Sequence, residues 1–378
     1  MDEFPVVSWV EAGQVHTVRW RSEGAVLPPK RILVVDDSIS ADIAYRHACE
    51  GTALLWRGDF HNARQLLQAM ARRAERKPRK QKPVAPASSP AEPFHLHRQA
   101  QAQRARMLGM LLLQFDAGHR LNLRRAPEVS AACAEAYGEA NEPYVASLRE
   151  LLGLIGAHEW RKKGVAIPML GGRIHPHYGV FSPVRGEYVD LVAQAPLPAK
   201  NLAFDIGTGS GVLAAVLALR GVARVVATDQ DPRALACARD NIDRLGLAGK
   251  VEVVQADLFP EGKAALIVCN PPWIPARPSA PIEHAIYDPD SRMLRGFLNG
   301  LRAHLEPGGE GWLILSDIAE HLGLRTRADL LSAFEAAQLK VVERMDIRPR
   351  HGKSSDASDP LHLARASEIT SLWRLAAR

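Results

Sequence analysis

Four consecutive residues, Asn270-Pro271-Pro272-Trp273, bring together groups that could bind a flat molecule carrying an NH2 group. The side-chain oxygen of Asn270 and the carbonyl oxygen of Pro271 are hydrogen-bond acceptors, and a proline has no N–H of its own. The indole of Trp273 offers an aromatic face for stacking. The exocyclic amine of adenine or guanine, or the side-chain amide of glutamine, would match these groups. The alternative is an ordinary turn with Trp273 in the core, and the tetrapeptide alone does not decide between the two.

The element that must position this tetrapeptide directly precedes it. Residues 265–269 form a short apolar run, which is typical of a buried strand. Two consecutive prolines cannot continue the hydrogen-bonding ladder of a sheet, because neither has an N–H to donate. The chain should therefore leave the sheet at Asn270, at the carboxyl end of the strand. In open α/β sheets, ligands bind at that end of the strands.

A second group of candidate residues lies upstream, where Asp205 is followed by a glycine-rich turn. Residues 201–205 predict a short buried strand, and residues 212–220 predict an apolar helix. Glycines allow the backbone to turn sharply and to approach a ligand closely. The candidate binding residues of this turn are Gly207, Thr208, Gly209 and Gly211.

The next predicted strand, at 223–227, leads to Asp229, which lies 22 residues after Gly207. At that spacing an acidic residue usually accepts hydrogen bonds from the hydroxyl groups of a ribose. A dinucleotide would place its pyrophosphate at the helix N-terminus, where Asp205 would repel it. The G-x-G-x-G spacing also departs from the dinucleotide pattern. The carboxylate of Asp205 would attract the ammonium and sulfonium groups of S-adenosylmethionine, so this cofactor is favoured.

The remaining pattern alternates strands and helices, which predicts a mainly parallel sheet. A strand at 251–256 ends before Asp257, which stands where it could meet the amine of an adenine. The further elements expected are helices at 292–305 and 327–337, a strand at 311–315 and an antiparallel pair of strands at 341–347 and 369–375.

Residues 166–345 resemble the class I S-adenosylmethionine-dependent methyltransferases. The stretches that carry the resemblance are 204–211, Asp229, Asp257 and 268–275. More narrowly, they are similar to the "methyltransferase small" group, which includes HemK/PrmC-like glutamine methyltransferases of release factors and several rRNA and adenine-N6 methyltransferases. The resemblance implies an α/β fold with a Rossmann-like, seven-stranded sheet that ends in a reversed hairpin.

The resemblance also implies roles for individual residues. Asp205 and the glycines of the turn would hold the methionine part of the cofactor, Asp229 its ribose and Asp257 its adenine. The tetrapeptide 270–273 would form the catalytic motif, and its asparagine would also lie close to the cofactor. The stretch 179–188 stands where such enzymes carry a loop that covers the cofactor.

The composition changes along the chain, and its length allows more than one domain. From Arg72 to Lys82 there are seven basic residues and one acidic residue, and a stretch rich in Pro, Ala and Ser follows. This pattern is typical of a solvated linker, and a tether for RNA is the alternative. The predicted organisation is an N-terminal α/β or helical region at 1–75, a basic linker at 76–95, a helical domain at 96–165 and a methyltransferase domain at 166–378.

Residues 31–38 indicate a strand that ends in acidic residues, as in response-regulator receiver domains. A receiver domain would next need a phosphoacceptor Asp and a later Lys, and neither stands at a suitable spacing. A strand followed by a helix at 41–50 is the preferred interpretation. In the third part of the chain, the apolar spacing at 106–115 and 144–155 predicts helices.

Composition restricts the class of protein. Of the 378 residues, 47% are hydrophobic and 24% are charged, as in ordinary globular proteins. No signal peptide and no apolar stretch long enough to span a bilayer is visible. The four cysteines lie far apart, so neither a metal site nor a disulfide framework is predicted. We therefore expect a cytoplasmic protein without a membrane partner, and the net charge of +6 favours polyanionic partners.

The sequence thus predicts an S-adenosylmethionine-dependent N-methyltransferase that acts on a planar NH2 nitrogen, with a base in RNA, above all ribosomal RNA, as the expected acceptor. A glutamine N5-methyltransferase acting on a protein such as a release factor is the alternative. The loop 348–366 would contact phosphate together with the linker through Arg348, Arg350, His351 and Lys353. Two further hypotheses are a cofactor-binding regulatory module without turnover and an NAD-type oxidoreductase.

Overall fold

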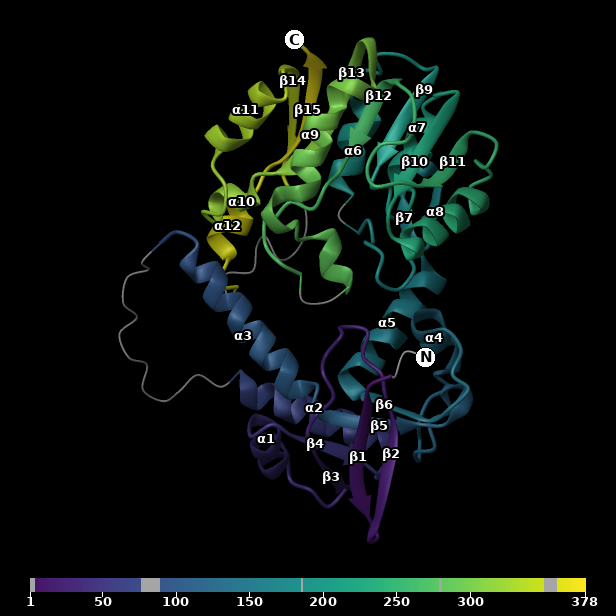
Figure 1. Cartoon of the computed structure of the whole chain (residues 1–378), viewed down its shortest axis with the longest axis vertical. Helices are drawn as coiled ribbons and strands as arrows, with labels where there is room; N and C mark the ends of the chain where they lie inside the picture. The colour runs from purple at the N-terminus through teal and green to yellow at the C-terminus, as the bar shows by residue number, and fades with distance from the viewer. Residues whose placement is uncertain (1–3, 76–88, 185, 279–280, 350–358) are drawn as a thin grey trace. The chain divides into compact units, whose positions relative to one another are not determined.

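The computed structural model describes residues 4–75, 89–184, 186–278, 281–349 and 359–378. The described residues divide into two compact units, each with its own sheet (Figure 1). Residues 4–75 and 95–159 belong to the first unit. Residues 89–94 belong to the second unit, together with those that follow residue 159. The predicted basic linker at 76–95 falls largely on residues 76–88, which lie outside the described residues.

The first unit is an α/β structure. Its strands are β1 (Val6–Glu11), β2 (Gln14–Trp20), β3 (Arg31–Val35), β4 (Thr52–Trp56), β5 (Leu111–Phe115) and β6 (Tyr144–Ser147). They form one sheet in the order β1-β2-β6-β5-β4-β3, in which β3, β4 and β5 are parallel and β6 runs antiparallel to β5. The helices that lie wholly or mostly in this unit are α1 (Ala41–Cys49), α2 (Phe60–Ala74), α3 (Glu92–Leu108), η1 (Ala117–His119), α4 (Ser130–Tyr137) and α5 (Leu148–Lys163).

The predicted division of the N-terminal half differs from the structure. A helical domain was expected at 96–165, separate from 1–75, but β5 pairs with β4 and β6 pairs with β2, so both stretches contribute to one sheet. The apolar run 106–115 contains the end of α3 and then β5, whose leucines are fully buried. A strand buried on both faces has the same continuous apolar pattern as a short buried helix, and this pattern misled the sequence-based prediction.

The second unit is built on a seven-stranded sheet, which confirms the α/β, Rossmann-like class. The strands of this sheet are β9 (Leu202–Ile206), β10 (Arg224–Asp229), β11 (Val251–Gln255), β12 (Ala264–Cys269), β13 (Leu305–Ser316), β14 (Leu339–Ile347) and β15 (Thr370–Ala377). Their order is β11-β10-β9-β12-β13-β15-β14. The strands from β9 to β13 are parallel, and β15 runs antiparallel to both of its neighbours, as the predicted reversed hairpin requires.

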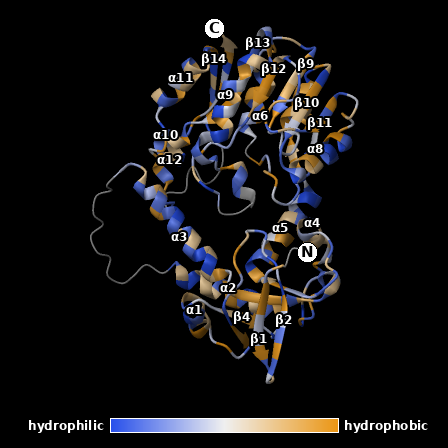
Figure 2. Cartoon of the chain, viewed as in Figure 1, coloured by the Kyte–Doolittle hydropathy of each residue, from blue (hydrophilic) through white to orange (hydrophobic). Residues whose placement is uncertain are grey.

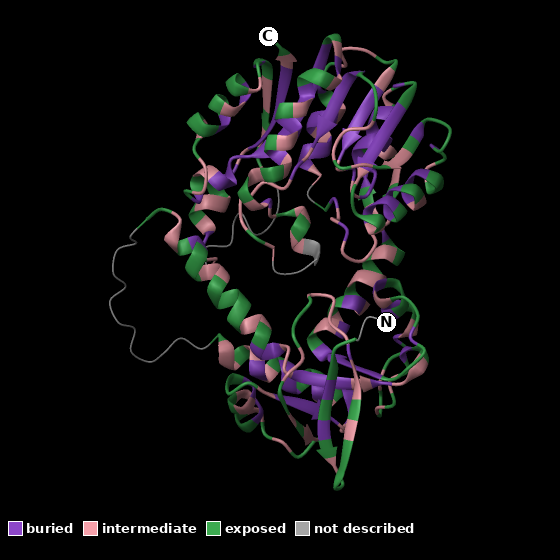
Figure 3. Ribbon diagram, in the orientation of Figure 1, coloured by how far each residue is buried: buried purple, intermediate pink, exposed green. Residues whose placement is uncertain are grey.

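Helices cover both faces of this sheet, because successive side chains of a buried strand point to opposite sides. The helices of the unit are η2 (Pro168–Leu170), α6 (Glu187–Gln194), α7 (Val212–Leu219), α8 (Pro232–Arg244), η3 (Pro281–Ala285), η4 (Pro289–Ser291), α9 (Arg292–His304), α10 (Ile318–His321), α11 (Arg327–Ala336) and α12 (His362–Ser367). Ala203 and Leu266 pack with α6, α7 and α8, whereas Phe204 and Ile267 pack with α9 and α11. The central strands are therefore mostly hydrophobic (Figure 2) and buried (Figure 3).

Two smaller features complete the unit. The short strands β7 (Val165–Ile167) and β8 (Gly172–Ile174) form an antiparallel hairpin. The predicted loop at 348–366 is partly helical, because α12 begins at His362. Residues 350–358 lie outside the described residues, and so do the predicted phosphate contacts of Arg350, His351 and Lys353. Among the described residues, no helix has both the length and the apolar character that crossing a membrane requires.

Candidate active site

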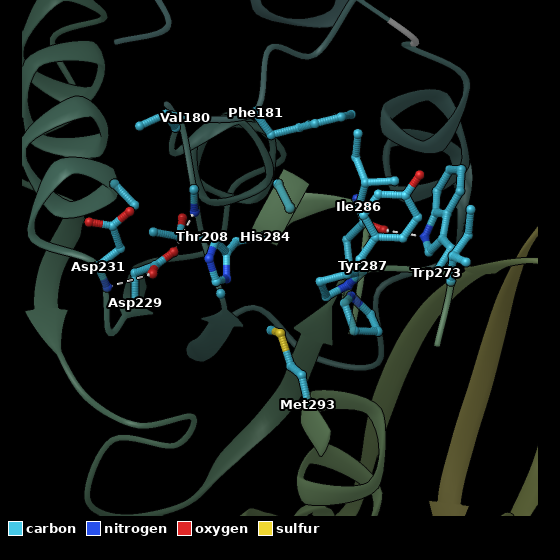
Figure 4. Close-up of a pocket in the computed structure, with 18 of the residues that line it drawn as sticks. Val180, Phe181, Thr208, Asp229, Asp231, Trp273, His284, Ile286, Tyr287 and Met293 are labelled. Atoms are coloured by element: carbon cyan, nitrogen blue, oxygen red, sulfur yellow. Dashed lines mark hydrogen bonds between the residues drawn. The ribbon is translucent and has the colours of Figure 1, made fainter. Parts of the chain in front are cut away.

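A cavity of about 660 Å³ lies at the carboxyl ends of β9, β10 and β12. Strand β9 stands between β10 and β12 and is parallel to both, and the order of the strands reverses at this point. Such a reversal leaves a crevice above the strand ends, where ligands bind in open α/β sheets. In Figure 4, Asp229 and Asp231 lie at one end of the cavity and Trp273 at the other, with Thr208 and His284 between them.

The glycine-rich turn after β9 forms the floor of this cavity. Gly207, Gly209 and Gly211 have φ angles of +69°, +55° and +81°, a left-handed backbone that favours glycine. A Cβ on Gly211 would lie 3.2 Å from the Cα of Ala238 in α8, so the start of α7 packs directly on that helix. Of the four candidate residues of this turn, Gly207, Thr208 and Gly209 line the cavity, and Gly211 is not among the described residues that do.

Asp205 is placed differently from the expectation. Its side chain is buried, with 1% of the residue exposed, and it is not among the described residues that line the cavity. Its Oδ2 accepts hydrogen bonds from the hydroxyl of Thr208 at 2.6 Å and from the N–H of Ala214 at 3.0 Å. Burial raises the pKa of Asp205 to about 6, although both hydrogen bonds act in the opposite direction. In this structure, Asp205 shapes the turn and caps the first turn of α7.

Asp229 lies in the cavity and is tied to the glycine-rich turn. Its Oδ2 accepts a hydrogen bond from the N–H of Gly209, and its Oδ1 accepts one from the N–H of Asp231, both at 3.0 Å. Burial raises the pKa of Asp229, and these backbone hydrogen bonds partly offset that effect. Asp231 also lines the cavity, and its side chain caps α8 by accepting a hydrogen bond from the N–H of Arg233. The two carboxylates make this end of the cavity acidic.

Asp257, the residue expected to meet the adenine, also lines the cavity, and it has a cationic partner that the sequence does not indicate. Its Oδ2 accepts a hydrogen bond from the guanidinium of Arg292 at 2.8 Å, and both residues are exposed. Arg292 is the first residue of α9. Leu258 lines the cavity beside them, so this side of the cavity combines an ion pair with an apolar surface.

The tetrapeptide 270–273 follows β12, and all four of its residues line the cavity. The indole N–H of Trp273 donates a hydrogen bond to Oδ1 of Asn270 at 2.9 Å (Figure 4). An indole N–H can only donate, so this bond selects the oxygen of the amide as its partner. The carbonyl-type oxygen retains a second lone pair for another donor. Trp273 is half-buried and packs against the hydrophobic core. It therefore both lines the cavity and contributes to the core, the two possibilities that the sequence left open.

Residues 284–287, whose position the sequence does not predict, line the cavity next to Trp273. The N–H of Asp288 donates to the carbonyl of Ile274 at 2.8 Å, and Ile274 forms a β-bridge with Tyr287. The carboxylate of the buried Asp288 accepts hydrogen bonds from the N–H groups of Met293 and Leu294 at the start of α9. The sequence Asp-Pro-Asp-Ser before an apolar run is a helix-start signal, but no local pattern indicates that Tyr287 and its neighbours face a cavity.

The stretch 179–188 contributes Gly179, Val180, Phe181 and Tyr188 to the cavity, and α6 begins within it at Glu187. Figure 4 shows Val180 and Phe181 along one side of the cavity, across from Met293. The stretch therefore lies at the cavity, and its role as a loop that covers the cofactor stays a prediction. Residue 185 lies outside the described residues.

Comparison with known proteins finds a family match that includes most of the residues lining this cavity. Residues 172–343 match the family model of the methyltransferase small domain. The chain is 41% identical to a ribosomal protein L11 methyltransferase of Pelotomaculum thermopropionicum over 144 residues, which cover 37% of this chain and 39% of that protein. It is 35% identical to a release factor glutamine methyltransferase of Cereibacter sphaeroides over 161 residues, covering 39% of this chain and 56% of the relative.

A third relative is a tRNA1(Val) (adenine(37)-N6)-methyltransferase of Shewanella loihica, 29% identical over 203 residues that cover 48% of this chain and 84% of that protein. The chain spans less than two thirds of the length of the first two relatives. The matched range contains the glycine-rich turn, Asp229, Asp257 and the tetrapeptide. Residues 172–343 therefore belong to the methyltransferase small domain family, and they form a class I methyltransferase domain whose cofactor is S-adenosylmethionine.

Proposed function

We propose that the chain is an N-methyltransferase that transfers a methyl group from S-adenosylmethionine to a planar NH2 nitrogen, and that the acceptor is a base in ribosomal RNA. The observation that carries the proposal is the continuity of a single cavity. The glycine-rich turn and Asp229 line it at one end, and the bonded pair Asn270 and Trp273 lines it at the other. The groups that would hold the cofactor and the acceptor thus face the same space.

The charges at the site fit this cofactor. The buried carboxylate of Asp205 already occupies the N-terminus of α7, where a dinucleotide would place its pyrophosphate. A second anion at that point would be repelled, which disfavours an NAD-type oxidoreductase. Asp229 and Asp231 add negative charge inside the cavity, and a cofactor with ammonium and sulfonium groups is attracted by that charge. When bound, the cofactor supplies an electrophilic methyl group.

The chain has suitable partners for the rest of the cofactor. We assign Asp229 to the hydroxyl groups of the ribose and Asp257 to the amine of the adenine. A carboxylate has two oxygens, so Asp257 can accept from the adenine while it also accepts from Arg292. Val180, Phe181 and Leu258 supply apolar surface for the adenine ring. Gly207 and Gly209 bring backbone close to the methionine part, and Asp205 keeps the turn in shape.

Asn270 and Pro271 hold the acceptor nitrogen in the proposed mechanism. The second lone pair on Oδ1 of Asn270 and the carbonyl oxygen of Pro271 accept the two N–H protons of the acceptor. These bonds favour a pyramidal nitrogen, whose lone pair is less delocalised and more nucleophilic. Fixing that lone pair in line with the methyl group supplies most of the acceleration. The proton leaves to water after transfer, so the reaction requires no strong general base.

The choice of RNA is supported by the charge of the chain and by one relative. The net charge of +6 favours a polyanionic partner. The relative from Shewanella loihica is named for adenine N6 methylation of a tRNA. If the target base lies in a helix, it must leave the stack, and Trp273 offers a face to receive it. The second candidate is a protein glutamine, which the relative named as a release factor glutamine methyltransferase favours.

One labelling experiment separates these acceptors. The full chain is incubated with S-adenosylmethionine carrying a tritiated methyl group and, in parallel, with in vitro transcribed ribosomal RNA or with ribosomal proteins and release factors. The proposal is supported if the RNA becomes labelled and if ribonuclease, but not protease, releases that label. Label confined to the protein fraction refutes the RNA acceptor and supports glutamine. Cofactor binding without label in either fraction refutes transfer to both acceptors and leaves a regulatory module.

A further inference from the structure

The wall of the cavity next to Trp273 is built partly from residues outside the family match at 172–343. Phe94 comes from the segment 89–94, and Leu361 comes from the residues just before α12. Phe94 is 2% exposed and packs in one hydrophobic cluster with Ile318, Leu322 and Leu361. Trp273, Ile274 and Tyr287 pack against the same cluster. The side of the cavity that receives the acceptor is therefore completed by parts of the chain that the family domain does not include.

The segment 89–94 packs closely against Gly323 of the second unit. Gly323 has a φ of +68°, and a Cβ at this position would lie 2.6 Å from the Cβ of Pro90 and 3.2 Å from the nitrogen of Ala91. Such distances are too short for a side chain, so only glycine lets the segment approach this closely. The segment is grouped with the second unit, although the residues that follow it belong to the first. These contacts hold Phe94 in place in the wall.

The chemistry of this wall favours a large flat acceptor. Trp273 and Phe94 are aromatic, and Ile318, Leu322 and Leu361 are aliphatic. The charged residues Arg365 and Glu368 also line the cavity, but this cluster offers mainly apolar contact, which suits a ring better than a narrow polar chain. A base that leaves its stack loses stacking energy, which aromatic side chains in a binding pocket restore. A glutamine side chain has no ring to stack and would leave much of this surface without contact.

We propose that Phe94 determines acceptor specificity, because the segment 89–94 and the residues around Leu361 form the apolar wall that receives the ring of a nucleobase. The proposal rests on the proposed function and goes further by naming the residue that selects the acceptor. Because Phe94 and Leu361 lie outside the family match, this part of the wall is not a feature of the matched domain.

The test compares Phe94→Ala and Phe94→Tyr with the wild-type chain. The substrate is in vitro transcribed ribosomal RNA, and the readouts are kcat and KM for the RNA together with the Kd for S-adenosylhomocysteine. Phe94 is 2% exposed and acts by packing behind Trp273, so loss of its ring should misplace the surface that receives the base and lower kcat/KM for the RNA roughly 10- to 100-fold. The Kd for S-adenosylhomocysteine should stay within about twofold, because Asp229 and the glycine-rich turn are untouched. Phe94→Tyr, which keeps the ring, should restore most of the activity.

The matched controls are Leu96→Ala and Leu363→Ala, which shorten side chains that are 56% and 83% exposed and do not line the described cavity. Both should behave as wild type. If Phe94→Ala no longer binds S-adenosylhomocysteine, Phe94→Leu replaces it, because leucine retains apolar volume without the ring, and it should still lose activity. If the wild-type chain methylates RNA and the Phe94 variants have the same kcat/KM, this inference is overturned and the proposed function stands. Absence of RNA methylation by the wild type overturns it together with the proposed function.

Discussion

The indole N–H of Trp273 donates a hydrogen bond to the side-chain oxygen of Asn270 at 2.9 Å, and both residues line the same cavity. Because the indole can only donate, the bond orients the amide of Asn270 with its oxygen toward the tryptophan. Trp273 thus has two roles in the proposed mechanism. Its ring offers a face to the methyl acceptor, and its N–H orients the Asn270 oxygen that receives a hydrogen bond from the NH2 group of that acceptor.

Replacing Trp273 by phenylalanine separates these two roles. Trp273→Phe keeps an aromatic face and removes the hydrogen bond, whose net value is about 0.5–1.5 kcal/mol. We expect kcat to fall roughly two- to tenfold, and to fall further in Trp273→Ala. Steady-state methyl transfer to RNA measures both. Trp160→Phe, at a tryptophan that is 48% exposed, is the control. Equal rates for Trp273→Phe and wild type would show that the bond does not position Asn270.

Removing the amide itself should have a larger effect on transfer than on cofactor binding. In Asn270→Ala the acceptor nitrogen loses a hydrogen-bond partner and its alignment, and misplacement of this kind costs on the order of 100-fold in rate. Calorimetry with S-adenosylhomocysteine should show a Kd close to that of the wild type. Asn201→Ala changes an exposed asparagine before β9 and serves as the control. Undiminished transfer in Asn270→Ala would contradict the role proposed for this residue.

Asp229 should matter for the cofactor rather than for the acceptor. Hydrogen bonds to a charged group contribute about 1.5–3 kcal/mol, so Asp229→Asn should weaken binding of S-adenosylhomocysteine by roughly 10- to 100-fold. The change also disturbs the turn, because the carboxylate accepts from the N–H groups of Gly209 and Asp231. Asp243→Asn, at an exposed position of α8, is the matched control. A Kd unchanged in Asp229→Asn would exclude a contact with the ribose.

Asp205 predicts a specific dependence of stability on pH. Burial raises the pKa of its carboxyl from 3.8 to about 6 in the folded chain. The folded state then binds a proton more tightly than the unfolded state, so the stabilisation is complete below about pH 4 and is lost as the pH rises through about 6. A shift of this size corresponds to about 3 kcal/mol. Asp205→Asn has no such proton to lose.

We therefore expect the stability of Asp205→Asn relative to wild type to increase by up to about 3 kcal/mol between pH 4 and pH 7. Thermal unfolding of the two full-length chains at several pH values measures this difference. Titrating groups that do not interact with Asp205 contribute equally to both proteins and cancel, whereas Asp229 interacts electrostatically with Asp205. A difference that stays constant with pH would show that Asp205 titrates normally in the folded chain.

Much of the second unit could be predicted from the sequence, because its strands and helices alternate. One boundary differs, since β13 begins at Leu305, six residues before the strand predicted at 311–315. The apolar run 265–269 is followed by Asn270 and two prolines, and the structure places β12 at Ala264–Cys269. The N-terminal half was less predictable. There the buried strand β5 resembles the end of a helix in its pattern, and only its pairing with β4 and β6 reveals the sheet. Pairing between distant segments leaves no local signal.

The same distinction applies to the cavity. Gly207 and Asn270 each follow a strand and Asp229 is the last residue of one, so sequence order alone indicates that they share an edge of the sheet. Phe94 and Tyr287 reach the cavity through tertiary contacts, and no spacing indicates their position. Residue type alone does not predict the position of Asp205. A carboxylate next to the glycine-rich turn is expected to touch the cofactor, but its side chain is buried and accepts hydrogen bonds from the Thr208 hydroxyl and the N–H of Ala214.

The position of the transferred methyl group tests the proposed chemistry most directly. Ribosomal RNA methylated by the chain is digested to nucleosides, which are separated and identified by mass spectrometry. We predict a methyl group on an exocyclic amine, as in N6-methyladenosine or N2-methylguanosine, and its loss with Asn270→Ala. A methyl group on a ring nitrogen, a carbon or a ribose oxygen would contradict the claim that Asn270 and Pro271 hold a planar NH2 group.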